Sequence, residues 1–337
     1  MTSLARALRG FAIALVSLLP AIGMAQAAPS TATLRVGKAF AGVFDFTPLD
    51  VGMKEGFFKQ HGLDIEEYNF AGSAKLQQAL AADAIDIGLG SGPELAFVAR
   101  GAPVKGVAAF MGPPDGLVIL VGAHSGIDAP ADLKGKLISV STVGSLTQWL
   151  VRDLSREEGW GPNGVRLAYL GASPAQVSAM IAGNTDGMVS DVVKATILEQ
   201  KGVGRILISL GKVAPDFITH VVYARKALIA GHPNEVKEFL AGWFETVEWM
   251  RTHKAETVKI AAANMHEPPA IVAKAYDVTM PALSNTGVFR PKALAVLRRS
   301  FVEMGLLKTA PTMDTLYTQR FLPSPSAHVA TASTAGR

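Results

Sequence analysis

The sequence predicts an α/β protein whose two similar lobes face each other across a cleft. Two segments one hundred positions apart, residues 79–91 and 179–191, read alike: a helix end, a turn, an aspartate, a short apolar strand and small polar residues. Asp86 in the first segment matches Asp186 in the second. Because ligands of open α/β sheets bind beyond the carboxyl ends of the strands, two facing lobes of this kind would enclose a binding cleft.

The residues that follow Ala32 alternate between strand and helix patterns. The predicted elements of this region are strands at 33–37, 64–70 and 85–89, and helices that begin at Pro48, Ser73 and Glu94. Proline suits a first helical turn, and serine suits a helix cap. The βαβ alternation predicts a mostly parallel sheet.

The second lobe repeats this order and is followed by a helical region. Further strands are predicted at 116–122, 137–140, 165–170, 187–189, 203–210 and 219–224, the last of which returns the chain to the first lobe. From Pro233 onward the apolar residues have helical spacing, which predicts amphipathic helices that pack on a core. We therefore expect lobe 1 at 33–122 plus 225–322 and lobe 2 at 123–224, with two crossovers that form a hinge.

The two ends of the chain and its composition limit where the protein acts. Residues 1–27 combine Arg6 and Arg9, a short apolar run and the ending Ala25-Gln26-Ala27, which predicts a cleaved export signal rather than a membrane span. The remainder carries 30 basic against 28 acidic residues, which argues against a nucleic-acid partner. With no cysteine there is no thiol for lipid attachment. We expect a periplasmic monomer that is not a lipoprotein, with a disordered tail at 323–337.

Sequence motifs of catalysis are missing or incomplete. The chain contains no H-E-x-x-H, Walker A or G-x-S-x-G motif, and its seven histidines lack metal-ligand spacing. Ser209–Lys212 satisfies S-x-x-K without the accompanying motifs of that enzyme class. The sequence therefore predicts no enzyme, no catalytic residue, no metal and no cofactor.

Polar loops that lead from strands into helices recur along the chain and form the predicted ligand site. Its residues are Phe44, Asp45, Thr47, Ser73, Ser91, Gly92, Thr142, Gly144, Ser145, Ser190 and Asp191. Helix N-termini and hydroxyls bind carboxylate or sulfonate groups, although Ser73 and Ser145 can equally act as helix caps. Asp45 and Asp191, on opposite lobes, favour an amine, amide or ring N–H on the ligand, or else cap turns.

Several ordered motifs resemble those of one transport family. These are Pro48–Ile65, Ala79–Leu80 with Ile85–Gly88, Gly101–Lys105 and Asp132–Lys136. Residues 33–310 are similar to the nitrate/sulfonate/taurine-type substrate-binding proteins of ABC transporters, and to their thiamine pyrimidine-precursor relatives. The resemblance implies a two-lobed type II periplasmic binding fold that closes on a small solute.

The resemblance also implies partners and a site. The solute would pass to an ABC permease in the inner membrane, with its ATPase behind it, and the family's contacts fall on the loop residues named above. Asp45 stands where sulfonate binders have an aromatic or neutral residue, so we expect a small organic molecule (sulfonate, carboxylate or pyrimidine-like) rather than an inorganic anion. A periplasmic ligand sensor or adaptor, or a pyrimidine-synthase-like enzyme on the same fold, stays an alternative.

Overall fold

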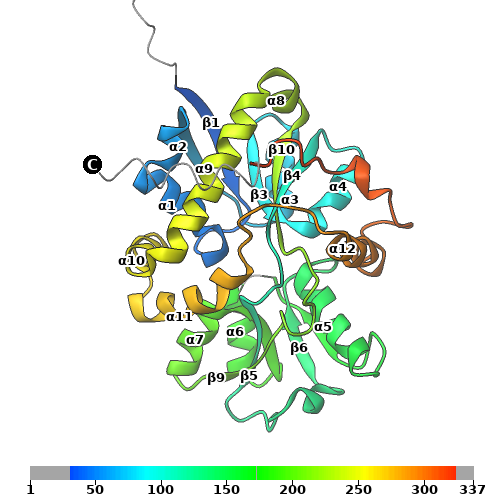
Figure 1. Ribbon diagram of the computed structural model, residues 1–337. Helices are drawn as coiled ribbons and strands as arrows, with labels where there is room; N and C mark the ends of the chain where they lie inside the picture. The colour runs from blue at the N-terminus through cyan, green and yellow to red at the C-terminus, as the bar shows by residue number, and fades with distance from the viewer. Residues whose placement is uncertain (1–30, 172, 324–337) are drawn as a thin grey trace, which may run out of the picture. The chain divides into compact units, whose positions relative to one another are not determined.

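The computed structural model describes residues 31–171 and 173–323, which belong to one compact unit (Figure 1). The predicted export signal lies outside the described residues. The predicted disordered tail lies outside them as well, except for its first residue, Pro323.

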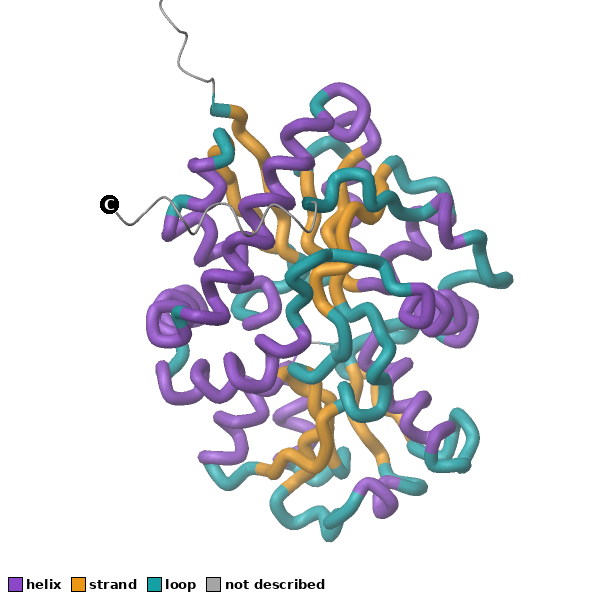
Figure 2. Tube along the Cα trace, viewed as in Figure 1, coloured by secondary structure: helices purple, strands orange, loops and turns teal. Residues whose placement is uncertain are grey.

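Two five-stranded sheets organise the chain (Figure 2). The first contains, in spatial order, β2 (Leu63–Asn69), β1 (Ala32–Lys38), β3 (Ile87–Ser91), β10 (His220–Arg225) and β4 (Val104–Met111). The second contains β7 (Arg166–Tyr169), β6 (Leu137–Val140), β8 (Gly187–Asp191), β5 (Leu117–Gly122) and β9 (Gly204–Ser209). In both sheets the first three strands are parallel, and the fourth runs antiparallel to both neighbours. The two-lobed α/β prediction is confirmed.

The repeat in the sequence corresponds to a repeat in the structure. Helix α3 (Ser73–Ala81) and helix α6 (Ser173–Ile181) have bounds one hundred residues apart, and so do β3 and β8. In each sheet the fourth strand comes from outside the stretch of chain that supplies the three parallel strands: β10 joins the first sheet, and β5 joins the second. Each sheet is thus built from the same parts.

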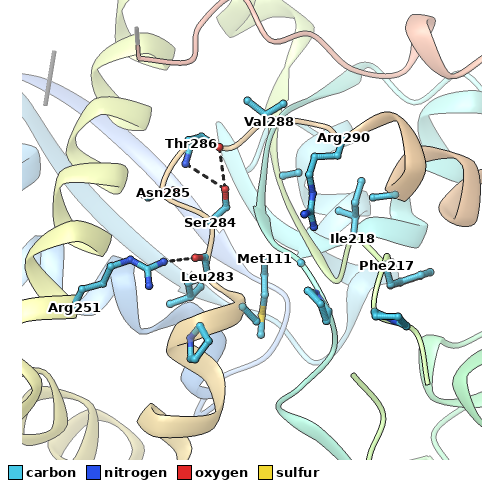
Figure 3. A pocket seen from close by; sticks show the side chains of 17 residues that line it. Met111, Phe217, Ile218, Arg251, Leu283, Ser284, Asn285, Thr286, Val288 and Arg290 are labelled. Carbon is cyan, nitrogen blue, oxygen red and sulfur yellow. Dashed lines mark hydrogen bonds between the residues drawn. The ribbon is translucent and has the colours of Figure 1, made fainter. Parts of the chain in front are cut away.

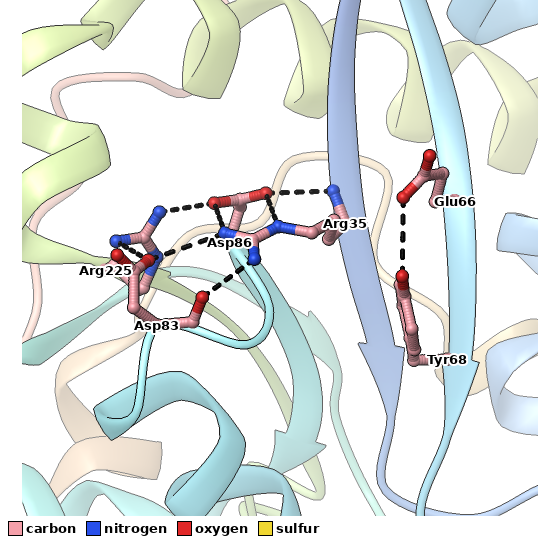
Figure 4. Close-up of polar contacts among 6 residues, drawn as sticks. All are labelled: Arg35, Glu66, Tyr68, Asp83, Asp86 and Arg225. Atoms are coloured by element: carbon pink, nitrogen blue, oxygen red, sulfur yellow. Dashed lines mark hydrogen bonds and ion pairs between the residues drawn. The ribbon is translucent and has the colours of Figure 1, made fainter.

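Each of the matching aspartates accepts a hydrogen bond from the backbone of a neighbouring strand. Asp86 Oδ2 accepts a hydrogen bond from the Arg35 backbone N–H at 3.0 Å, and Asp186 Oδ2 accepts one from the Leu137 N–H at 2.7 Å. Asp86 also pairs with the guanidinium groups of Arg35 and Arg225 (Figure 4). Burial alone would raise the pKa of Asp86, but hydrogen bonds from both arginines outweigh it and lower the pKa to about 2. These aspartates therefore stabilise the fold.

Strand pairing moves both expected lobe boundaries. We expected residues up to 122 in lobe 1, but β5 pairs with β8 and β9 in the second sheet. We expected lobe 2 to run to 224, but β10 pairs with β3 and β4 in the first sheet. An apolar strand pattern shows that a segment is buried and does not show which sheet receives it. The segments 112–116 and 211–219 connect the sheets.

Helices cover the sheets and bring the end of the chain back to the first one. The remaining α-helices are α1 (Thr47–Glu55), α2 (Phe57–Gln60), α4 (Leu95–Ala99), α5 (Leu146–Glu157), α7 (Val192–Gln200), α8 (Lys226–Gly231), α9 (Pro233–Thr252), α10 (Lys254–Met265), α11 (Pro269–Thr279) and α12 (Pro291–Glu303). Short 3-10 turns are η1 (Phe44–Phe46), η2 (Gly92–Glu94), η3 (Pro130–Leu133), η4 (Met280–Ala282) and η5 (Met313–Thr315). Sequence analysis gave no bounds for β4 or for helices α8, α10 and α11, although its helical region from Pro233 onward includes the last two.

The C-terminal helices contact both lobes. Helix α9 packs on α1, α2 and β2, and the side chains of Trp243 and Phe244 are fully buried, as their helical spacing predicts. Helix α11 packs against α7 of the second lobe. Glu303, at the end of α12, accepts hydrogen bonds from Trp149 Nε1 at 2.7 Å and from Arg156 at 2.9 Å, both on α5. The return segment therefore lies beside the second lobe as well as the first.

Candidate functional site

The predicted site residues lie where strands of both sheets end. Asp45 lies in η1, in the loop after β1, and Ser91 and Asp191 are the last residues of β3 and β8. Thr142, Gly144 and Ser145 occupy the turn between β6 and α5. The secondary structure thus places the candidate residues at the carboxyl ends of the parallel strands, where ligands of α/β sheets bind.

Asp45 is buried and bound to a histidine that sequence analysis did not select. His220 Nε2 lies 2.9 Å from Asp45 Oδ2, and His220 Nδ1 lies 3.2 Å from the carbonyl oxygen of Gly90. The carbonyl can only accept, so Nδ1 carries a hydrogen. A further proton must lie between Nε2 and the carboxylate, and the pair as a whole is therefore neutral. The rings of Phe46 and Phe110 pack against His220 on its other sides.

A chain of contacts links Asp45 to Asp191 in the other lobe. A Cβ added to Gly116 would lie 3.3 Å from Asp45 Oδ1 and 3.3 Å from Thr279 Oγ1. The Gly116 carbonyl accepts a hydrogen bond from the N–H of Val192, the residue after Asp191, at 2.8 Å. Gly116 lies in a segment that connects the sheets, so it brings these polar groups together.

Asp191 caps helix α7, and no cationic side chain within the described ranges contacts it directly. Its Oδ1 accepts the Lys194 backbone N–H at 2.9 Å. Burial raises the pKa of Asp191, and the charge of Asp45 raises it further, while the backbone hydrogen bond and the charge of Lys194 act in the opposite direction. The Lys194 ammonium itself lies 3.8 Å from Glu267. Asp191 is thus a carboxylate held in a setting that disfavours its charge.

Two buried hydroxyls of these elements have no hydrogen-bond partner among residues 31–171 and 173–323. They are Ser190 Oγ, whose residue is 5% exposed, and Thr279 Oγ1, whose residue is 1% exposed. Buried hydroxyls are normally satisfied, because an unmade hydrogen bond costs about 1–3 kcal/mol. The Thr279 hydroxyl, which lies near Asp45, is therefore available to a bound group, whereas Ser190 lies on the opposite face of β8 from Asp191.

Ser73 and Ser91 surround a third buried carboxylate, Glu94. Ser91 donates to Glu94 Oε1 from its backbone N–H at 2.7 Å, and Gln77 donates to Oε2 at 2.6 Å. Burial raises the pKa of Glu94 against these hydrogen bonds. The two serine hydroxyls lie 3.4 Å apart, and Ser73 is the first residue of α3 rather than a side-chain cap. The expected capping role of Ser73 is wrong.

The turn at 142–145, which belongs to the predicted ligand site, satisfies several of its own donors. Gly144 adopts a left-handed φ of 76° and donates its N–H to Gln148 Oε1 at 2.7 Å. The Gln148 N–H donates to Ser145 Oγ at 3.2 Å, so Ser145 is a true helix cap. The Ser141 N–H donates to Thr147 Oγ1 at 3.1 Å. Thr142 is exposed. The backbone donors of Ser141, Gly144 and Gln148 are therefore already in use.

Three predicted residues act mainly in packing. Phe44 meets the Tyr276 ring edge-on at 6.1 Å between ring centroids, and Thr47 is the buried first residue of α1. Gly92 lies against the backbone of Ile218, where an added Cβ would be 2.1 Å from the carbonyl oxygen. The ring of Phe44 is thus occupied by Tyr276 and buried.

Sequence reasoning missed His220, Glu94 and Thr279. His220 begins an apolar strand, and Glu94 begins a helix after a proline, so each looks ordinary in its local setting. His220 reaches Asp45 because β10 enters the first sheet, and Thr279 lies near Asp45 because α11 packs against η1. The only local signal was the pairing of Ser91 with Glu94 three residues later, which is the spacing of a capping box.

Two cavities lie away from these residues. The first, about 560 Å³, lies beside the segments that connect the sheets, and Met111, Ile218, Arg251 and Arg290 are among its lining residues (Figure 3). The second, about 610 Å³, borders Arg35 and Asp86. None of the predicted ligand contacts lines either cavity. The candidate site therefore rests on the strand ends and on the buried polar groups.

Comparison with known proteins identifies relatives of similar length. Residues 43–257 match the family model described as NMT1/THI5 like. "Putative binding protein YtlA" of Bacillus subtilis is 22% identical over 288 residues, which are 84% of this chain and 83% of that protein. The crystal structure of the periplasmic aliphatic sulphonate binding protein SsuA from Escherichia coli superimposes with a TM-score of 0.72 at 20% identity, over 87% of this chain and 93% of that one.

An enzyme also shares the fold. The structure of the desulfurization enzyme DSZB superimposes with a TM-score of 0.61 at 18% identity, over 85% of this chain and 97% of that one. No helix within the described ranges is both long and apolar enough to cross a membrane. From the matched family model and the shared architecture, the chain belongs to the NMT1/THI5-like family and has the two-lobed fold of periplasmic binding proteins.

Proposed function

We propose that the protein is an exported solute-binding protein of an ABC importer. It would bind a small organic molecule between its lobes in the periplasm and deliver it to an inner-membrane permease. The observation that carries this proposal is the approach of Asp45, from the first lobe, to Asp191, from the second, through Gly116. A solute that contacts both carboxylates would favour the closed arrangement of the lobes, as a hinge mechanism requires.

Relatives with binding roles support the proposal, and the chemistry of the chain argues against an enzyme. YtlA and SsuA are both described as binding proteins. DSZB shows that the fold can also carry catalysis. This chain has no cysteine at all, so a thiol nucleophile is excluded. A sensor or adaptor would use the same site and differ in its docking partner.

A thermal-shift screen tests solute binding directly. The purified protein, unfolded and refolded to remove carried-over ligand, should be stabilised by one class among sulfonates, aromatic carboxylates, pyrimidines, amines and nitrate. A ligand at one hundred times its dissociation constant adds about 2.7 kcal/mol to the free energy of unfolding. Recovery of the solute unchanged after incubation is expected of a binding protein. Its chemical conversion would instead support an enzyme.

A further inference from the structure

The electrostatic character of the site points to the class of its ligand. Three buried or half-buried carboxylates lie at the strand ends: Asp45, Glu94 and Asp191. Within residues 31–171 and 173–323, no arginine or lysine side chain forms an ion pair with any of them. Asp45 is balanced by His220, whereas Glu94 and Asp191 have only hydrogen-bond donors. The ends of the strands are therefore acidic.

Hydrogen bonds and strand pairing connect the strand ends, so the three carboxylates belong to one region. His220 lies opposite Ser91 in the ladder between β10 and β3, and Ser91 holds Glu94. His220 is also hydrogen-bonded to Asp45. Asp45 Oδ1 in turn lies 3.3 Å from the position that a Cβ on Gly116, the residue before β5, would occupy. In the second sheet, Leu117 lies opposite Asp191. Contacts thus run without a break from Glu94 to Asp191.

Several donors that an anion would need are already in use. The N–H groups of Ser141, Gly144 and Gln148 donate to side chains of their own turn. At the starts of η2 and α7 a carboxylate of the chain itself occupies a backbone donor: Glu94 accepts from Ser91, and Asp191 accepts from Lys194. An incoming sulfonate or carboxylate would meet the charges of these carboxylates at both starts.

The Thr279 hydroxyl supplies an independent sign of a ligand, because it is buried and has no hydrogen-bond partner among residues 31–171 and 173–323. Thr279 Oγ1 and Asp45 Oδ1 each lie 3.3 Å from the position that a Cβ on Gly116 would occupy. The Ser190 side chain belongs to the opposite face of β8 from Asp191. Oxygen atoms of hydroxyls and carboxylates together accept hydrogen bonds from an ammonium or amidinium group. The Lys194 ammonium, whose charge acts on Asp191, lies 3.8 Å from Glu267.

We infer that the site between the lobes takes a small organic cation, an ammonium or amidinium whose N–H groups bind Asp191, Asp45 and the Thr279 hydroxyl. This inference rests on the proposed solute-binding function and names its ligand class. It separates this chain from SsuA, which is described as an aliphatic sulphonate binding protein. The cation would neutralise the charge of Asp191, whose carboxylate accepts the Lys194 backbone N–H and contacts no cationic side chain among the described residues.

Probe pairs that share a carbon skeleton and differ in charge test the inference. Thermal shifts and calorimetric affinities are measured for butylammonium against butanesulfonate and for benzylammonium against phenylmethanesulfonate. We expect the ammonium member of at least one pair to bind and the sulfonate member not to bind. Binding of the sulfonates alone, or of both members equally, overturns the cation class and leaves the solute-binding function intact. Absence of binding by every probe counts against both.

A charge-removing variant assigns the effect to the site. Asp191→Asn retains an oxygen that can cap α7, because asparagine is a good N-cap residue, but it loses the charge. It should weaken ammonium affinity about ten-fold or more, the loss expected for a charge-assisted hydrogen bond. Asp128→Asn makes the same change at a carboxylate whose side chain is 91% exposed and should leave the affinity unchanged. Equal affinity in Asp191→Asn and the native protein overturns the inference.

Discussion

Replacing Gly92 with alanine is expected to destabilise the protein by about 3 kcal/mol, at the upper end of overpacking costs. The added Cβ would lie 2.1 Å from the Ile218 carbonyl oxygen, and backbone atoms cannot rotate away as a flexible side chain can. The Gly92 N–H also donates to the Thr219 carbonyl at 2.9 Å, so relief of the clash would strain this hydrogen bond. Urea denaturation measures the change in the free energy of unfolding.

A glycine in open space provides the control for Gly92. Gly231 is the last residue of α8, and an added Cβ there would have no atom within 4 Å. Gly231→Ala should therefore maintain or slightly raise the stability, since alanine favours helix over glycine by up to about 1 kcal/mol. If Gly92→Ala were as stable as Gly231→Ala, the close approach of the connecting segment to β3 would be wrong.

Asp86→Ala is expected to cost about 3–5 kcal/mol, the usual result of removing one partner from a buried ionic cluster. The substitution leaves the Arg35 and Arg225 guanidinium groups without their buried carboxylate. It also leaves the Arg35 backbone N–H without its acceptor. The stability is measured by denaturation at neutral pH, where the carboxylate is charged because its pKa is about 2.

The neighbouring Asp83 offers a matched surface variant. It pairs with the same two arginines, but its side chain is 69% exposed, and exposed ion pairs contribute only about 0–1 kcal/mol. Its φ of 62° is better tolerated by asparagine than by alanine, so Asp83→Asn is the suitable change. A loss in Asp83→Asn as large as that in Asp86→Ala would contradict the structural role of Asp86.

Much of the fold follows from the sequence because the repeat is local and strong. The bounds of α3 and α6 and of β3 and β8 reproduce the hundred-residue spacing, and Asp86 and Asp186 have the same backbone contact. The sheet that β5 enters could not be predicted, because pairing depends on long-range contacts and an apolar pattern carries no partner information.

The candidate site was predictable in position but not in chemistry. Strand ends identify Asp45, Ser91 and Asp191, since each follows an apolar strand. The ionisable partners of these residues, His220 beside Asp45 and Glu94 beside Ser91, are brought there by long-range folding and cannot be identified from the local sequence. The turn at Gly144 and Ser145 looked suited to an anion, and only the structure shows that Gln148 and Ser145 already use its donors.

The most direct test of solute binding between the lobes is a distance measurement across them. The chain has no native cysteine, so spin labels can be attached specifically to Lys75→Cys on α3 and Ala175→Cys on α6, both exposed positions. A labelled pair within the first lobe, Lys54→Cys with Lys75→Cys, serves as the control. Saturation with the solute that stabilises the protein should shorten the distance between the lobes and leave the control unchanged. An unchanged distance distribution between the lobes at saturation would contradict closure around the solute.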